Sequence, residues 1–312
     1  MSDIVDNIIS GDARSIARLI TLVENNSDDA IQYMKKLHKY SGNAQIIGIT
    51  GVMGSGKSSL IYEIAHEYRK HNKKIGIIAI DPTSPFSGGA VLGDRIRMME
   101  LATDDNVFIR SMGTHGMLGG ITCSVYDVVR ILDAAGMDII LIETVGVGQD
   151  QVDIVKIADT TIVVLVPGLG DSIQTIKAGL MEIADIFVVN KADKKEAEQV
   201  VAEIESMLDI SSKSDRNITI IKTSTKEKQG ISDLVDEIEN HKDYLIKSKK
   251  YNTQKKKRYQ AELTELIRKK LICYVFDESN LENKMDILID QISNKKIDPY
   301  TATEEILGKI LK

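Results

Sequence analysis

Apolar residues are spaced differently in different parts of this chain, and the spacing predicts where helices and strands lie. Before residue 45, Ile16, Leu19, Ile20 and Val23 recur three and four positions apart, as on one face of a helix. From residue 45 onward, short apolar runs are separated by helix-like stretches. The runs predict strands at residues 46–50, 74–80, 107–111, 138–143, 160–166, 186–190 and 218–222. Such continuous apolar runs are typical of strands that helices cover on both faces.

The order of these elements indicates the fold class. Strands that alternate with helices predict an α/β fold, with a doubly wound and mostly parallel sheet that binds ligands at the carboxyl ends of its strands. After about residue 245 the strand pattern stops, and residues 281–292 return to helical spacing. We therefore expect a helical N-terminal extension, an α/β nucleotide-binding domain and a helical C-terminal extension, at residues 1–44, 45–245 and 246–312.

A glycine-rich motif lies between the first predicted strand and the helix-like run that follows it. Residues Gly51 to Ser58 read G-V-M-G-S-G-K-S and fit the phosphate-loop pattern G-x-x-x-x-G-K-[ST]. Glycines let the backbone wrap a phosphate, and the N–H groups at the helix N-terminus face the anion. We expect Lys57 to contact the β- and γ-phosphates and Ser58 to bind Mg²⁺. The predicted phosphate-binding residues are Gly51, Gly54, Ser55, Gly56, Lys57, Ser58 and Ser59.

A second motif, N-K-x-D, follows the predicted strand at 186–190 and indicates which base is bound. The Asp193 carboxylate can accept from both the ring N–H and the exocyclic amine of guanine, a pair of donors that adenine lacks. Asn190 would brace the loop, and the stem of Lys191 would cover the flat face of the base. Thr223, Ser224 and Thr225 could supply backbone N–H groups to the guanine oxygen. Together with the phosphate loop, this motif predicts a GTP site rather than an ATP site.

The predicted strand at residues 138–143 ends in an acid, as Walker-B strands do. The acid is Glu143, and Gly146 would let the backbone approach the γ-phosphate. Val147 stands where small GTPases keep a water-orienting glutamine. The pattern therefore predicts GTP hydrolysis with a slow intrinsic rate, or with a catalytic group from elsewhere, and Lys57 and Glu143 are the candidates for catalytic roles.

Composition and charge exclude several other classes of protein. The chain has 312 residues, of which 43% are hydrophobic and 28% are charged, and no run of 18 apolar residues predicts a membrane span. The N-terminus lacks the features of a secretion signal, and the two cysteines, Cys123 and Cys273, are far apart in the sequence. We expect a cytoplasmic protein. The net charge of −6 argues against nucleic-acid binding, and we interpret the basic run Lys247–Arg258 as a solvated helix face.

These motifs, with several longer segments, resemble the MeaB/ArgK/MMAA family of P-loop GTPases. The resemblance covers nearly the whole chain. It includes Gly11–Arg18, the phosphate loop, Asp81–Arg95, Glu143–Gln149 and the N-K-x-D motif. The long segments Asp81–Arg95 and Glu143–Gln149 are far more specific than the phosphate loop alone.

The resemblance implies a biological role as well as an activity. Family members act as chaperones of the adenosylcobalamin-dependent methylmalonyl-CoA mutase. The resemblance implies that this chain binds GTP, GDP and Mg²⁺, forms a homodimer, gates cofactor loading and protects an acyl-CoA mutase. The adenosyltransferase of that mutase is a further candidate partner, whereas no nucleic acid or membrane is expected to bind.

The resemblance also assigns roles to individual residues. It implies that Ser58, Asp81, Asp94 and Glu143 are the direct or water-mediated ligands of Mg²⁺, and hard carboxylate oxygens suit this cation. It implies that Gly168–Gly179 forms a third switch, in which Lys177 reaches a γ-phosphate or pairs with an acid. The chain departs from the family pattern at His115, where an arginine is usual.

Other functions and assemblies stay open at this point. A kinase would transfer the γ-phosphate to an acceptor other than water. A metal-insertion GTPase would need a cluster of soft ligands, which the sequence lacks. The client could be an isobutyryl-CoA mutase or another acyl-CoA mutase, and a monomer with a packed helical tail is the alternative to a dimer.

Overall fold

The structure, a computed structural model, describes residues 4–81, 100–113, 123–144, 146, 150–168, 179–211, 218–278 and 281–310. The chain forms two compact units, Met1–Arg258 and Tyr259–Lys312. The domain boundaries expected at residues 44 and 245 stay predictions.

A parallel sheet forms the centre of the first unit. Within the described residues it has seven strands in the order β3-β2-β4-β1-β5-β6-β7, and each neighbouring pair is parallel. The strands are β1 (Gln45–Gly51), β2 (Ile75–Asp81), β3 (Val107–Gly113), β4 (Ile139–Glu143), β5 (Thr160–Leu165), β6 (Ile186–Val189) and β7 (Thr219–Lys222). The doubly wound fold predicted from the apolar runs is confirmed.

The helices of the first unit follow or precede these strands. The α-helices are α1 (Ile4–Ile9), α2 (Ala13–Glu24), α3 (Asp28–Leu37), α4 (Lys57–Lys70), α6 (Cys123–Ala134), α7 (Asp150–Asp153), α9 (Met181–Ile183), α10 (Ala197–Ser211) and α11 (Ile231–Lys247). Short 3-10 turns are η1 (His38–Tyr40), η2 (Leu101–Thr103) and η3 (Ile154–Lys156).

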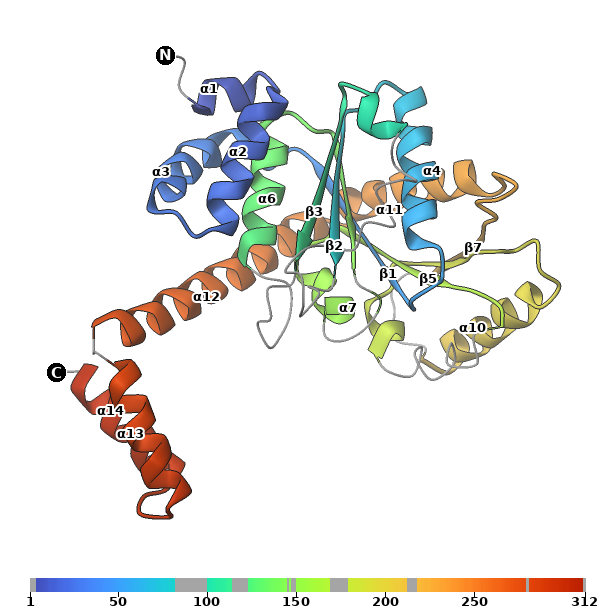
Figure 1. The fold of residues 1–312 in the computed structure, drawn as a ribbon. Coiled ribbons are helices and arrows are strands. Elements are labelled where there is room, and N and C mark those ends of the chain that lie inside the picture. Colours follow the sequence, from blue (N-terminus) through green and yellow to red (C-terminus); the bar gives the residue numbers. More distant parts are fainter. Residues whose placement is uncertain are drawn as a thin grey trace. The chain divides into compact units, whose positions relative to one another are not determined.

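Helices cover both faces of the sheet (Figure 1). Successive residues of a strand point to opposite faces, so neighbouring residues of β1 enter different cores. Ile47 and Ile49 pack in one cluster with residues of α4 and α11. Ile46 packs in a separate cluster with residues of α2, α3 and α6. With both faces covered, a ligand can reach the sheet only at the strand ends.

The N-terminal helices are attached to α6 and to the edge of the sheet. Helix α2 begins after Asp12, whose side chain accepts a hydrogen bond from the backbone N–H of Ser15 at 2.8 Å. Helices α2 and α3 pack against α6, and Glu24 of α2 forms an ion pair with Arg110 of β3. The predicted N-terminal extension is therefore helical and packs against the sheet domain.

Helix α12 (Lys250–Glu278) begins in the first unit and corrects one interpretation of the sequence. Two residues of the basic run do not belong to a solvated face. Lys255 donates from Nζ to the carbonyl oxygen of Gly42 at 3.0 Å, and Arg258 pairs with Asp159 at 3.1 Å. The Arg258 side chain is only 12% exposed. The sequence pattern could not reveal this pairing because the two partners lie far apart in the chain.

The second unit continues α12 and adds α13 (Leu281–Ser293) and α14 (Pro299–Ile310). Helices α13 and α14 contact each other, and Leu288 and Ala302 are buried. Asp298 caps α14, because its carboxylate accepts from the backbone N–H groups of Tyr300 and Thr301 at 2.8 and 3.0 Å. Among the described residues, no helix has the length and apolar character needed to cross a membrane.

Candidate functional site

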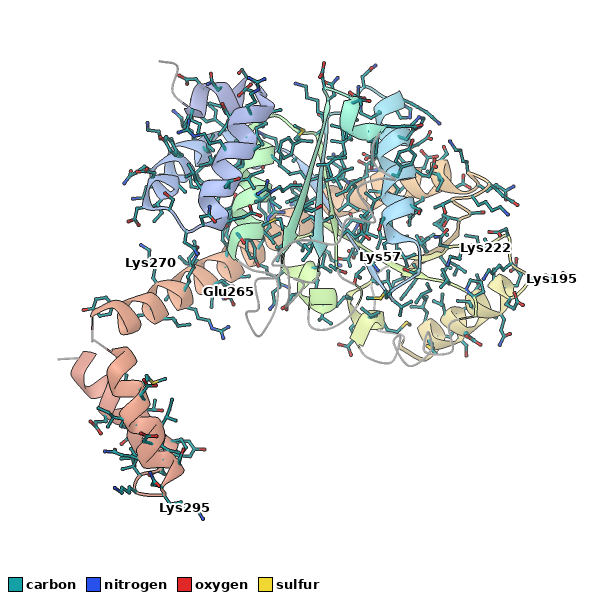
Figure 2. All side chains as sticks on the ribbon, in the orientation of Figure 1. Lys57, Lys195, Lys222, Glu265, Lys270 and Lys295 are labelled. Carbon is teal, nitrogen blue, oxygen red and sulfur yellow. The ribbon has the colours of Figure 1, made fainter. Side chains whose placement is uncertain are left out.

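The polar side chains that the motifs singled out gather at one edge of the sheet. All strands run parallel, so the carboxyl ends of β1, β4, β6 and β7 lie at this edge. Lys57, the first residue of α4, lies here (Figure 2). The site has two parts, a glycine-rich loop between β1 and α4 and a pair of polar loops after β6 and β7.

The glycine-rich loop has a backbone that strongly favours glycine at two positions. Gly51 has a φ of +142°, and a Cβ there would lie 2.2 Å from the carbonyl oxygen of Val164. Gly56 precedes α4 with a φ of +85° and offers no side-chain cap to the first N–H groups of the helix. The Ser55 hydroxyl is buried and has no hydrogen-bond partner within the described residues. Uncapped N–H groups and a buried hydroxyl at a helix N-terminus fit a bound anion.

Lys57 brings a positive charge to this loop. Its Nζ donates to the carbonyl oxygens of Gly51 and Val52 at 3.0 and 3.2 Å, and the residue is 6% exposed. Gly146 approaches the same point from the end of β4, since a Cβ on it would lie 2.7 Å from Lys57 Nζ and 3.0 Å from the Gly51 oxygen. The structure therefore brings Lys57 and Gly146 together, and their contact with a γ-phosphate stays a prediction.

A pair of oxygen-bearing side chains lies beside the loop. The Ser58 hydroxyl donates to Oε1 of Glu143 at 2.7 Å. Asp81 is the last residue of β2, on the strand next to β4, where Ala79 pairs with Glu143. A hydroxyl and a carboxylate in contact are hard oxygen donors, and this chemistry fits Mg²⁺.

The loop after β6 connects the two parts of the site. The amide nitrogen of Asn190 donates to the Ser55 carbonyl oxygen at 2.9 Å, and its amide oxygen accepts from the Thr223 hydroxyl at 3.2 Å. Lys191, with a φ of +58°, donates from Nζ to the Gly54 carbonyl oxygen at 2.9 Å. Asn190 therefore braces the glycine-rich loop, as the sequence predicts.

The carboxylate of Asp193 has a partner that the sequence interpretation missed. The Ser224 hydroxyl donates to Asp193 Oδ1 at 2.9 Å and so fixes the orientation of the carboxylate. The sequence predicts that backbone N–H groups of residues 223–225 meet a guanine oxygen. The N–H groups of Thr223 and Ser224 instead donate to the carbonyl oxygens of Val189 and Gln229. Thr225, in the following turn, is the remaining candidate donor of the three.

The site also contains a contact between two threonines that no sequence motif predicted. The Thr144 hydroxyl donates to the Thr50 hydroxyl at 3.0 Å, and both residues are buried. This contact joins the residue before the glycine-rich loop to the residue after Glu143. Threonine is common at strand ends, so only the sheet order reveals that the two hydroxyls meet.

Some residues singled out from the sequence lie outside the described residues or side chains. They are Asp94, His115 and Lys177, together with the side chains of Asp81, Cys123 and Cys273. Ser59 is described and lies in the first turn of α4. The predicted roles of all these residues stay predictions.

Comparisons with known proteins give the family. Residues 16–280 match the model of the family described as methylmalonyl Co-A mutase-associated GTPase MeaB. The chain is 45% identical over 315 residues to a Pyrococcus abyssi protein whose name describes it as a GTPase. The match covers 100% of this chain and 97% of that protein. It is 38% identical over 202 residues to the mitochondrial methylmalonic aciduria type A homolog of Caenorhabditis briggsae, covering 60% and 49% of the two chains.

A solved structure supports the fold. A crystal structure described as an LAO/AO transport system kinase aligns with a TM-score of 0.72 and 23% identity, and the match covers 99% of this chain and 97% of that chain. The resemblance seen in the motifs is thereby confirmed for both family and fold. With its glycine-rich loop, its Ser58–Glu143 pair and its N-K-x-D loop joined at one edge of a parallel sheet, this chain belongs to the MeaB family of GTPases.

Proposed function

We propose that this GTPase couples slow GTP hydrolysis to an adenosylcobalamin-dependent acyl-CoA mutase, with methylmalonyl-CoA mutase as the first candidate. Hydrolysis would gate the loading of the cofactor and protect the mutase from inactivation. One observation carries the proposal. The anion-binding loop, the oxygen pair and the Asp193 loop form a single hydrogen-bonded site in a chain that matches a mutase-associated family over residues 16–280.

The residues of the site have distinct proposed roles. Lys57 and the N–H groups of the loop hold the β- and γ-phosphates and offset the charge that develops during attack by water. Ser58 and Glu143, with Asp81 and Asp94, hold Mg²⁺, which when bound neutralises phosphate charge. Asp193, oriented by Ser224, selects guanine. Lys177 is proposed to reach the γ-phosphate or to pair with an acid.

The expected slow turnover follows from what stands after Gly146. Val147 has no group that could orient water, whereas small GTPases have a glutamine there. A partner that supplies a group to orient the attacking water would therefore raise the rate. This is the physical reason to expect stimulation by a mutase, and the adenosyltransferase is a further candidate for such a partner.

Hydrolysis with and without a mutase tests the proposal. Phosphate release by the purified protein is expected to be slow, and a purified adenosylcobalamin-dependent acyl-CoA mutase from the same organism is expected to raise it about tenfold or more, equal to about 1.4 kcal/mol of activation free energy. Mutase alone is the control for contaminating activity. Tight GTP binding without stimulation by any candidate mutase would refute the coupling. Transfer of labelled γ-phosphate to a protein or small molecule would favour the kinase alternative.

We also propose that the protein is a homodimer that uses helix α12. Apolar side chains recur along this helix three and four positions apart and are exposed. They are Tyr259, Leu263, Ile267, Leu271 and Tyr274, with exposed fractions between 37% and 59%. Repeated spacing of this kind places them on one side of the helix, which suits a second copy of the same helix.

The dimer makes a direct prediction for two of these residues. Replacing Leu263 and Ile267 with glutamate is expected to turn the dimer into a monomer, because two charges would be buried without partners. Light scattering after size-exclusion chromatography measures the mass. Arg268→Glu, on another side of the same helix and 64% exposed, is the matched control and should stay dimeric. A wild-type protein that is monomeric at micromolar concentration would contradict the proposal.

A further inference from the structure

The first turns of α12 are fixed to the end of the sheet opposite the nucleotide site. Arg258 donates from Nη1 to Asp159 Oδ1 and to the carbonyl oxygen of Ile157, both at 3.1 Å. The other oxygen of Asp159 accepts from the backbone N–H of Ile46 at 2.9 Å. Asp159 precedes β5 and Ile46 lies near the start of β1, so this ion pair ties α12 to the amino ends of the two strands.

This ion pair is buried, and some buried polar atoms close to it in the sequence lack hydrogen bonds. The side chains of Arg258 and Asp159 are 12% and 4% exposed. Burial raises the pKa of the Asp159 carboxyl, and the positive charge of Arg258 opposes that shift. Nearby in sequence, both polar side-chain atoms of Gln45 and the amide oxygen of Gln254 are buried without a hydrogen bond to any described residue. A buried polar group without a hydrogen bond is destabilising, so this arrangement is less stable than a fully satisfied one.

A series of described contacts along β1 leads from the nucleotide site to this ion pair. After Glu143, the Thr144 hydroxyl contacts Thr50, at the carboxyl end of β1. Further on, Ile154 of η3 is fully buried against Gly48, where a Cβ would come within 2.4 Å of its Cγ1. Asp159 then reaches the N–H of Ile46.

These three contacts follow β1 from one end to the other. Positions 46, 48 and 50 are two residues apart along the strand, and their side chains therefore lie on the same face. The described residues between 144 and 159 consequently contact β1 from the phosphate loop back to the amino end of the sheet. Ile46, Ile154 and Ile157 also pack in one buried cluster. Close packing of this kind passes a displacement on rather than absorbing it.

We propose that Thr144 and residues 150–159 transmit the nucleotide state of the phosphate loop to the first turns of α12, and that Arg258 is the residue that receives it. A shift of Thr144 against Thr50 would pass along β1 to η3 and change the position of Asp159 and Ile157, to which Arg258 is bonded. Because coupling is reciprocal, whatever holds α12 would in turn change the relative affinity for GTP and GDP. The inference rests on nucleotide binding at the proposed site and is independent of which partner is served.

Hydrogen–deuterium exchange of the full chain, with GDP and with a non-hydrolysable GTP analogue, tests this route. Residues 144–159 and 250–258 are both expected to exchange at different rates in the two states, about two- to thirtyfold for α12, which is the range of coupling found along such routes. No difference at 250–258, with a clear difference at 144–153, would overturn the proposal. A failure to bind either nucleotide would instead refute the proposed function.

Variants separate coupling from mere stability. Arg258→Gln leaves a buried carboxylate without its partner and can unfold the protein, so the double variant Asp159→Asn with Arg258→Gln is the better test because it removes both charges. In the folded double variant, the nucleotide-dependent difference should persist at 144–153 and disappear at 250–258. Lys257→Gln, an exposed neighbour on the same turn, is the matched control and should keep the difference. Retention of the difference in the double variant would also overturn the proposal.

Discussion

Replacing Lys57 with alanine is expected to lower kcat for GTP hydrolysis about a hundred- to a thousandfold, as removal of one preorganised donor at a charged reaction centre does. The ammonium group is buried beside the loop and within 3.0–3.2 Å of two loop carbonyl oxygens. It is therefore positioned before any phosphate arrives. Phosphate transfer relies mainly on positioning and charge neutralisation, so a missing cation cannot be replaced by solvent.

Single-turnover hydrolysis measures this loss, and a fluorescent GTP analogue measures binding separately. Lys73→Ala, which removes an exposed lysine just beyond α4, is the matched control and should leave both unchanged. A loss of less than about threefold in the Lys57 variant would mean that the ammonium does not contact the phosphates, since a hydrogen bond to a charged group contributes about 1.5–3 kcal/mol, or more than tenfold.

Replacing Asp193 with asparagine is expected to weaken GTP binding about a hundredfold and to shift the preference toward xanthosine triphosphate. Guanine offers a ring N–H and an amine, and the carboxylate accepts from both. Loss of such charge-assisted hydrogen bonds corresponds to about 3 kcal/mol. Xanthine replaces the amine with an oxygen, which matches the donor and acceptor of an asparagine amide. The variant therefore replaces the complementary pair of carboxylate and guanine with that of amide and xanthine.

Competition between the two nucleotides measures this shift directly. Ser224→Ala is the informative control, because it removes the hydroxyl at 2.9 Å from Asp193 Oδ1 and keeps the carboxylate. That variant should bind GTP more weakly and still prefer it to xanthosine triphosphate. Equal weakening for both nucleotides in Asp193→Asn would indicate damage to the loop and would count against a direct contact with the base.

The sequence predicted the fold well because its strands are buried on both faces. Ile46, Ile47 and Ile49 lie in an unbroken apolar run, and the structure buries all three between helices. The glycine-rich loop was predictable for a related reason. Gly51 and Gly56 have positive φ angles that few other residues adopt, so the motif carries its geometry in its residue types.

Contacts between distant polar side chains could not be predicted in this way. The Ser224 hydroxyl and the Thr50–Thr144 pair depend on which strands are neighbours, and residue type alone does not give that order. Arg258 shows the same limit, since the adjacent Lys256 and Lys257 are exposed while it is paired with Asp159. The local pattern predicts the helices and strands. Which side chains of different strands and helices meet is known only once the order of the strands in the sheet is known.

Asn190 gives the site a property that neither of its parts has alone. Its side chain bonds to the Ser55 carbonyl and the Thr223 hydroxyl at once, so the glycine-rich loop and the loops after β6 and β7 form one hydrogen-bonded frame. When binding orders one half of that frame, the other half has less conformational entropy left to lose. A nucleotide that spans both loops would therefore bind as a chelate, with base and phosphates each reducing the entropic cost of binding the other, and more tightly than its two fragments would separately.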